Sequence, residues 1–148
     1  MSLKRACFSL AFCISMLSGC NKTTPEITVT ENWVRATAQG QEVGAAYMTI
    51  TSTTDTNLVG VESSIADSVE IHKMSMENGV MKMRMLEQLE LKANTPNKLE
   101  PGGFHLMLFD LKKSLTVGEQ TTFRLHFKNK AGKENFVTVD SPIFTDKP

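Results

Sequence analysis

Cysteine is scarce in this sequence and absent from most of it. The chain has three cysteines, Cys7, Cys13 and Cys20, and none follows Cys20. Disulfides are common in exported domains, and thiolates are frequent ligands of zinc and copper. The long stretch after Cys20 has no thiol for either purpose. Thiol–disulfide catalysis and thiolate metal sites are therefore excluded for that stretch.

An excess of charge of one sign is also missing. Lysine and arginine number 16, against 16 aspartate and glutamate residues. No basic run or arginine cluster is present, and a nucleic-acid-binding surface needs one. We therefore expect no nucleic-acid partner. Beyond the first twenty residues there is no long apolar run, so no later segment is expected to span a membrane.

The beginning of the chain has the pattern of an export signal. Lys4 and Arg5 precede an apolar run over residues 6–17. That run is too short for a transmembrane helix and suits the apolar core of a signal peptide. It ends in "LSGC" (17–20), which resembles the lipobox of bacterial lipoproteins, where the signal is cut before a cysteine that then carries lipid. An ordinary secretory signal with an incidental cysteine is the alternative.

The lipobox resemblance implies a division of the chain. We expect a lipoprotein signal peptide over residues 1–19, a lipidated Cys20 with a short tether over residues 20–26, and one domain over residues 27–148. Acyl chains on Cys20 would anchor the domain, because each buried CH₂ group contributes about 0.8 kcal/mol. The implied location is the periplasmic side of a bacterial membrane. Asn21, in place of an aspartate, slightly favours the outer membrane.

Short strand-like runs separated by turn residues fill the rest of the chain. They occupy residues 27–37, 44–53, 57–66, 68–76, 80–91, 104–111, 122–129 and 135–142. Helical periodicity is rare. This pattern predicts a single all-β domain, a Greek-key β-sandwich or barrel. In the run at 122–129, Phe123, Leu125 and Phe127 alternate with polar residues, so we expect His126 on the solvated face.

Five of the nine methionines lie in "IHKMSMENGVMKMRM" (71–85). Asn78-Gly79 is a strong hairpin turn, because both residues tolerate a positive φ. The turn predicts a register in which Met76 faces Met81, Met74 faces Met83 and His72 faces Met85. These six side chains then project from one face. Methionine suits strands less well than Val, Ile or Leu, so two explanations stay open, core packing and a soft Cu(I) site.

A second His-x-Met unit favours the metal. His105 and Met107 lie two apart in "GGFHLMLFD" (102–110), so both side chains point to one face of a predicted strand. Imidazole and thioether donors are all neutral and would leave a charge of +1 around Cu(I). They lack the thiolate of blue-copper sites and the carboxylates that Mg²⁺ and Ca²⁺ prefer. Geometry alone does not choose among Met74, Met83 and Met85 as a further ligand.

These blocks resemble those of a known family. Ten residues separate His72 from Met83, twenty-one separate Met83 from His105, and one separates His105 from Met107. This spacing, with "VEIHKMSMENGVMKMR" and "LEPGGFHLMLFDL", is similar to that of the periplasmic PCu(A)C copper chaperones.

The resemblance implies a cupredoxin-like fold and Cu(I) held by His72, Met83, His105 and Met107. It also implies delivery of copper to the dinuclear copper centre of cytochrome c oxidase, with that oxidase domain or a Sco-type assembly protein as the apo acceptor. Some members add copper at a His/Met-rich C-terminal tail, which "SPIFTDKP" does not match. We interpret the remaining hairpin methionines mainly as an apolar collar, with Met74 and Met85 as possible secondary ligands.

Three other functions are compatible with the sequence. A lipoprotein for copper scavenging or storage would bind the metal but would have no acceptor protein. A redox enzyme would need an acid–base pair near the ligands, and the nearby Glu70 and Glu77 are expected to be solvated surface residues. A structural lipoprotein would use the methionine face for packing on a partner. We favour a copper chaperone that is not an enzyme.

Overall fold

The computed structural model describes residues 25–148, which form ten β-strands and no helix, so that no helix in this range could cross a membrane. The strands in chain order are β1 (Ile27–Arg35), β2 (Gly44–Ser52), β3 (Thr56–Ser63), β4 (Ala66–Glu77), β5 (Val80–Leu86), β6 (Leu89–Leu91), β7 (Asn97–Leu99), β8 (Phe104–Leu111), β9 (Gln120–Lys128) and β10 (Glu134–Phe144). The expected all-β class is confirmed. The expected signal peptide and Cys20 lie outside the described residues.

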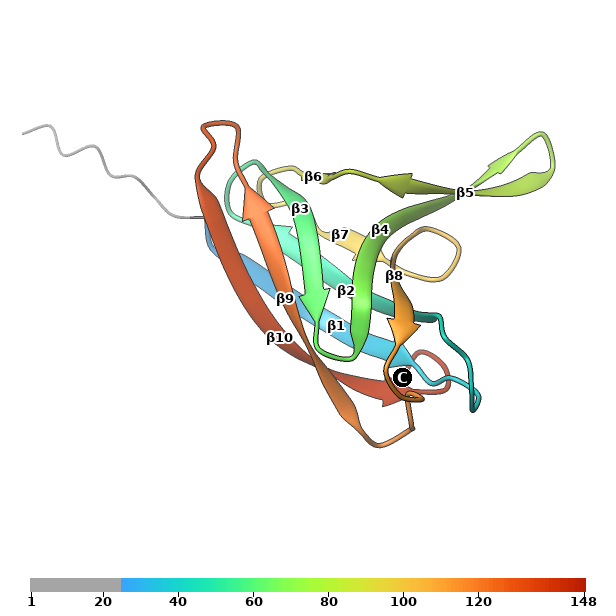
Figure 1. The fold of residues 1–148 in the computed structure, drawn as a ribbon. Coiled ribbons are helices and arrows are strands. Elements are labelled where there is room, and N and C mark those ends of the chain that lie inside the picture. Colours follow the sequence, from blue (N-terminus) through green and yellow to red (C-terminus); the bar gives the residue numbers. More distant parts are fainter. Residues whose placement is uncertain (1–24) are drawn as a thin grey trace, which may run out of the picture.

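The strands close into a barrel in which several neighbouring strands are not consecutive in the sequence (Figure 1). Neighbours around it run β4-β8-β2-β1-β10-β9-β3, and β3 pairs with β4 again through Val61 and Val69. Most pairs are antiparallel, whereas β1 and β10 run parallel. Strands adjacent in the barrel are often distant in the sequence, which is the Greek-key arrangement expected. Closure satisfies backbone groups that an open sheet would leave at its edges.

Alternating apolar residues fill the barrel. Phe123, Leu125 and Phe127 on β9 are fully buried, as their spacing predicted. Leu106 and Leu108 on β8 are also fully buried, and they alternate with His105 and Met107 along the strand. Because side chains alternate along a strand, this core row holds β8 in place from inside. His105 and Met107 are thereby directed to the other face.

Apart from small shifts at strand ends, the strands differ from the predictions in two places. The run at 80–91 is not one strand, because it stops at Leu86 and restarts as β6 at Leu89. Leu89 and Leu91 turn into the core and pair with β3, whereas β5 pairs with β4. The chain therefore changes partner strand between them. The short β7 was not predicted, since three residues carry too little alternation to show a strand.

His126 lies on the outer face of β9 between the exposed Arg124 and Lys128, as expected, but it is only partly solvated. Its ring stacks on Phe136 of β10 with a centroid distance of 4.3 Å, and its side chain is 30% exposed. His126 and Phe136 are cross-strand partners in the β9–β10 register. The exposed aromatic on β10 therefore covers the imidazole, a pairing that alternation within β9 could not show.

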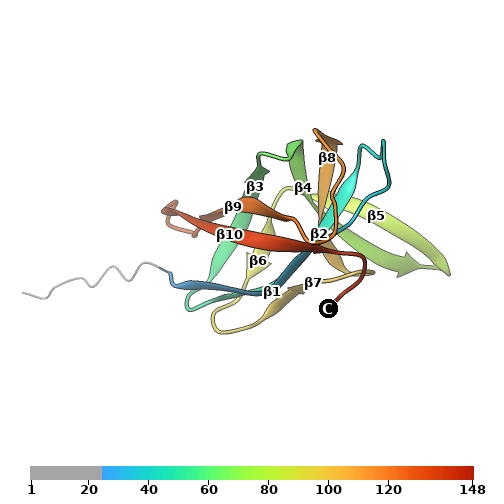
Figure 2. The same ribbon diagram turned by 90° about the horizontal axis from the view of Figure 1, so that it is seen from below.

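The methionine hairpin has the predicted turn and register. Asn78 and Gly79 have φ angles of 52° and 77°, as the tight turn requires. Met76 pairs with Met81, Met74 with Met83, and His72 with Met85. The first half of β4 belongs to the barrel, and its second half leaves the barrel with β5. The hairpin tip and the β9–β10 turn lie at opposite ends of the molecule (Figures 1 and 2).

Candidate metal centre

The structure brings together the two histidines of the His-x-Met units. His72 on β4 and His105 on β8 are cross-strand partners, and their ring centroids are 5.9 Å apart with a tilt of 39°. Because directly paired residues share a face, both rings lie on the same side as Met74 and Met107. The site therefore forms where β4 leaves the barrel, with β8 beneath it.

The surroundings of His105 favour the neutral imidazole and determine which ring nitrogen carries the proton. The side chain is buried, and its Nδ1–H donates to the carbonyl oxygen of Gly103 at 3.1 Å. Burial lowers the pKa of His105; the bond to Gly103 acts against this, and the neighbouring His72 adds to the lowering. With Nδ1 carrying the proton, Nε2 presents a lone pair. This arrangement is the usual one for a metal-binding histidine.

His72 is oriented by a carboxylate. Its Nε2–H donates to Oε2 of Glu70 at 2.8 Å, and the two side chains are 11% and 38% exposed. The other ring nitrogen, Nδ1, is buried and has no hydrogen-bond partner. A buried acceptor without a partner is uncommon and calls for an explanation. Nδ1 of His72 is therefore a nitrogen with which no group of the described residues forms a hydrogen bond.

The sequence analysis treated Glu70 as a solvated surface residue and not as part of the site. Its hydrogen bond to His72 corrects that expectation. The signal was present in the spacing, because residues two apart on a strand share a face. Glu77, by contrast, points to the opposite face of the hairpin and pairs with Lys82 and Arg84 there, at 3.0 and 2.8 Å.

Three methionines line one hollow together with His105. A hollow of about 180 Å³ is lined by Arg35, Ala45, Tyr47, Met74, Met83, Pro101, Gly102, His105 and Met107. Three of the four residues expected as ligands thus line one hollow, and the fourth, His72, contacts His105 directly. Met74 also lines it, so the hollow itself does not separate Met74 from Met83. Met85 instead lines a different hollow, beside Glu70.

One wall of this hollow is cationic and aromatic. The guanidinium of Arg35 lies over the rings of Trp33 and Tyr47, 5.8 and 5.5 Å from their centroids. Burial raises the pKa of Tyr47, although the nearby Arg35 acts against it. A fixed cation beside the site repels any metal ion, and it repels a divalent ion more strongly than a monovalent one.

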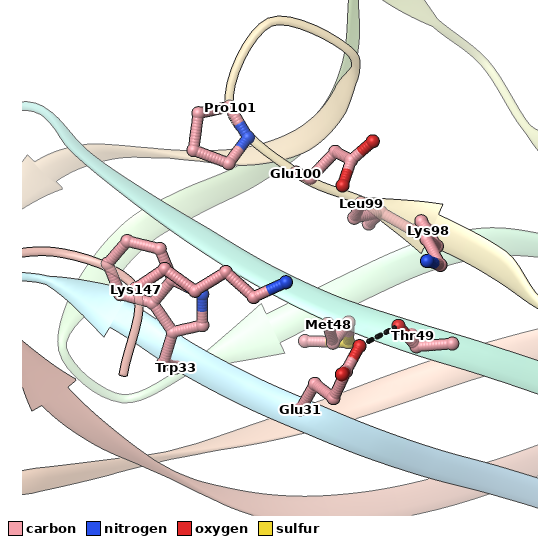
Figure 3. A pocket seen from close by; sticks show the side chains of 9 residues that line it. All are labelled: Glu31, Trp33, Met48, Thr49, Lys98, Leu99, Glu100, Pro101 and Lys147. Atoms are coloured by element: carbon pink, nitrogen blue, oxygen red, sulfur yellow. Dashed lines mark hydrogen bonds between the residues drawn. The ribbon is translucent and has the colours of Figure 1, made fainter.

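A second cavity, near Trp33, has no histidine in its lining (Figure 3). It has a volume of about 10 Å³ and lies between β1, β2 and the residues after β7. Met48 at its base is fully buried, and Glu31 at its rim accepts a hydrogen bond from the Thr49 hydroxyl. The space admits no more than about one water molecule. It is a gap in packing.

Comparison with known proteins gives one family. The family described as "Putative lipoprotein LpqE-like" matches residues 27–143. A curated relative, "Putative lipoprotein Lxx21020" from Leifsonia xyli subsp. xyli, is 28% identical over 109 residues, which cover 73% of this chain and 66% of the relative. The chain spans about two thirds of the length of the curated relatives that it matches.

Solved structures with the same architecture are copper-related domains. The copper-bound PCuAC domain from PmoF2 aligns with a TM-score of 0.64 and 26% identity, over 81% of this chain and 93% of that one. The solution structure of CuI-DR1885 from Deinococcus radiodurans aligns with a TM-score of 0.58 and 26% identity, over 81% and 77%. The cupredoxin-like fold expected for this chain is confirmed.

Proposed function

Because the chain belongs to the LpqE-like lipoprotein family and has the fold of the PCuAC copper domains, we propose that it is an extracytoplasmic Cu(I) chaperone. The observation that carries the proposal is the gathering of Met83, His105 and Met107 around one hollow, with His72 against His105. Two imidazoles and two thioethers form a neutral, soft donor set, which suits Cu(I). Lipidation at Cys20 would keep the domain at the periplasmic side of the membrane.

The ligand set is His72, Met83, His105 and Met107. His72 offers Nδ1, because Glu70 occupies Nε2, and His105 offers Nε2, because Gly103 occupies Nδ1. The two histidines of this set lie on β4 and β8, which are strands of the barrel. The sulfur of Met83 comes from the exposed hairpin, where its side chain is 46% exposed. An acceptor protein can therefore approach the sulfur side and exchange ligands one at a time.

We propose the dinuclear copper centre of cytochrome c oxidase, or a Sco-type assembly protein, as the acceptor. Support for this finer step comes from the resemblance of the His-x-Met blocks to the PCu(A)C chaperones. Copper transfer by ligand exchange involves no change of oxidation state, so no catalytic group is required. The protein acts as a carrier and not as an enzyme.

A transfer experiment tests this function. The Cu(I)-loaded protein is mixed anaerobically with the apo copper domain of an oxidase, separated from it by a dialysis membrane or in direct contact. We expect transfer on contact to be much faster than release across the membrane. Equal rates would instead support scavenging or storage, the alternative function. Failure of the purified protein to bind Cu(I) against a chelator would contradict both.

A further inference from the structure

The outer half of the methionine hairpin has an arrangement that the four-ligand site does not use. Met76 and Met81 are cross-strand partners, 63% and 52% exposed, and Met74 lies one step inward on the same face. Neither Met76 nor Met81 lines the hollow that contains His105 or the hollow beside Glu70. Packing therefore does not explain why these positions hold methionine, and β-branched residues would favour the strand more.

The backbone hydrogen bonds place these side chains close together. The amide of Met74 donates to the carbonyl of Gly103 on the β8 side, at 2.9 Å. It therefore points away from β5, so Met74 and Met83 form a non-hydrogen-bonded pair, and Met76 and Met81 form the next one. In such pairs the Cα atoms are about 4.5 Å apart and the side chains are closest. A diagonal neighbour such as Met74 to Met81 is within reach of long side chains.

The charges of the hairpin are kept on the other face. Glu77 is bound there by Lys82 and Arg84, and hydrogen bonding to Lys82, with the charge and hydrogen bond of Arg84, lowers the pKa of Glu77. The carboxylate of Glu77 is therefore not directed to the sulfur face. That face presents thioethers as its donors at the hairpin tip, and thioethers select Cu(I) over hard cations.

We propose that Met74, Met76 and Met81 form a second Cu(I) site made of thioethers, at the outer end of the hairpin, which passes copper to the four-ligand site. The proposal rests on the function proposed above, that the protein carries Cu(I). Met74 connects the two sites, because it belongs to the outer trio and also lines the hollow that contains Met83 and His105. Cu(I) moves inward by exchange of thioether ligands, with no change of oxidation state.

The first test uses the unaltered protein. Its methionine methyl groups are labelled with ¹³C, and silver(I) serves as a redox-inert probe for Cu(I) in NMR titrations. We expect the first equivalent to shift the methyl signals of Met83 and Met107. The second equivalent is expected to shift those of Met76 and Met81. Saturation after one equivalent, with the Met76 and Met81 signals unmoved, would overturn the proposal.

The second test compares two matched variants in anaerobic Cu(I) titrations against a chelator. The double variant Met76→Leu/Met81→Leu keeps volume and apolarity but removes both outer sulfurs. We expect it to lose the second equivalent, or to bind it at least about tenfold more weakly, with the first unchanged. Met48→Leu removes a sulfur that is buried in the core and does not line the hollow of His105, so this variant should retain both equivalents. Two unchanged equivalents in the double variant would overturn the location of the site.

These outcomes separate the outer site from the proposed function. If the first equivalent binds at His72, Met83, His105 and Met107 and no second one binds, the chaperone function stands and the outer site is wrong. If the Met76 and Met81 signals shift while those of Met83 and Met107 do not, the outer site stands and the four-ligand site is wrong.

Discussion

His72 and His105 face each other across β4 and β8 with their ring centroids 5.9 Å apart, and each has one ring nitrogen already bound by the protein. The bound nitrogens differ, Nε2 in His72 and Nδ1 in His105. We expect the two free nitrogens, Nδ1 of His72 and Nε2 of His105, to bind one ion. The remaining donors to that ion are expected to be thioether sulfurs.

Met83 and Met107 should be ligands, which volume-conserving substitutions can test. Met83→Leu and Met107→Leu remove a sulfur and should each cost less than about 1.5 kcal/mol of unfolding free energy. Each should lower Cu(I) affinity by about tenfold or more, measured against a chelator under anaerobic conditions. Met74→Leu and Met85→Leu should have small effects on the tightest site. Loss of tight binding in Met74→Leu or Met85→Leu, but not in Met83→Leu, would show that the ligand assignment is wrong.

Glu70 should act on copper through His72. Glu70→Gln replaces the carboxylate that accepts the Nε2–H of His72. Loss of such a partner typically weakens metal binding by about 10–100-fold. We expect a loss in this range, accompanied by a change in the ¹⁵N chemical shifts that report the His72 tautomer. Glu77→Gln, which changes a carboxylate on the opposite face of the same hairpin, is the matched control and should leave both measurements unchanged.

The metal preference should be that of a soft site. Thioether sulfur is uncharged and polarisable, so Cu(I) should bind far more tightly than Zn²⁺ or Cu(II). Competition titrations measure this preference directly, and X-ray absorption counts the sulfur and nitrogen ligands. Comparable affinities for Zn²⁺ and Cu(I) would refute the soft ligand set.

Acid should destabilise the copper-free protein through His105. Burial lowers the pKa of this side chain in the folded protein. The unfolded chain therefore takes up a proton first as the pH falls below the ordinary imidazole value of about 6.5, and the free energy of unfolding falls with it. We expect the His105 ring signals to titrate below that value in NMR. A midpoint at or above it would contradict the burial argument.

The cysteine at the end of the signal should be needed for anchoring and not for copper. Cys20→Ser should release the protein from the membrane fraction, while the purified domain keeps its Cu(I) affinity. Mass spectrometry of the unaltered protein should show lipid on Cys20. If the variant fractionates like the unaltered protein and the unaltered protein carries no lipid, the lipoprotein prediction is wrong.

Local patterns predicted much of this molecule. The Asn78-Gly79 turn determines which residues pair across the hairpin, because a two-residue turn leaves one register. Alternation likewise predicted the inward face of β9. The methionines on one hairpin face and the His105-x-Met107 unit could therefore be proposed as candidate donors from the order of residues alone.

Relationships between distant segments were not predictable in this way. Nothing near His72 in the sequence indicates that its partner across β4 and β8 is His105, because that register depends on how the barrel closes. The family spacing provided the association instead. The covering of His126 by Phe136 was missed for the same reason, since it depends on the β9–β10 register. The contact between Glu70 and His72 was local and was missed because charged strand residues are mostly solvated.

Strand β5 lies outside the closed part of the barrel. Among the described strands, β5 is hydrogen-bonded to β4 alone and stands at the end of the sheet order. Two residues can therefore be added to or removed from each arm of the hairpin without a change in the barrel, and every side chain keeps its face. Each such step adds or removes one pair of facing positions. The number of thioethers that the hairpin can present is thus set by its length, whereas Met107 on β8 belongs to the barrel and keeps its place.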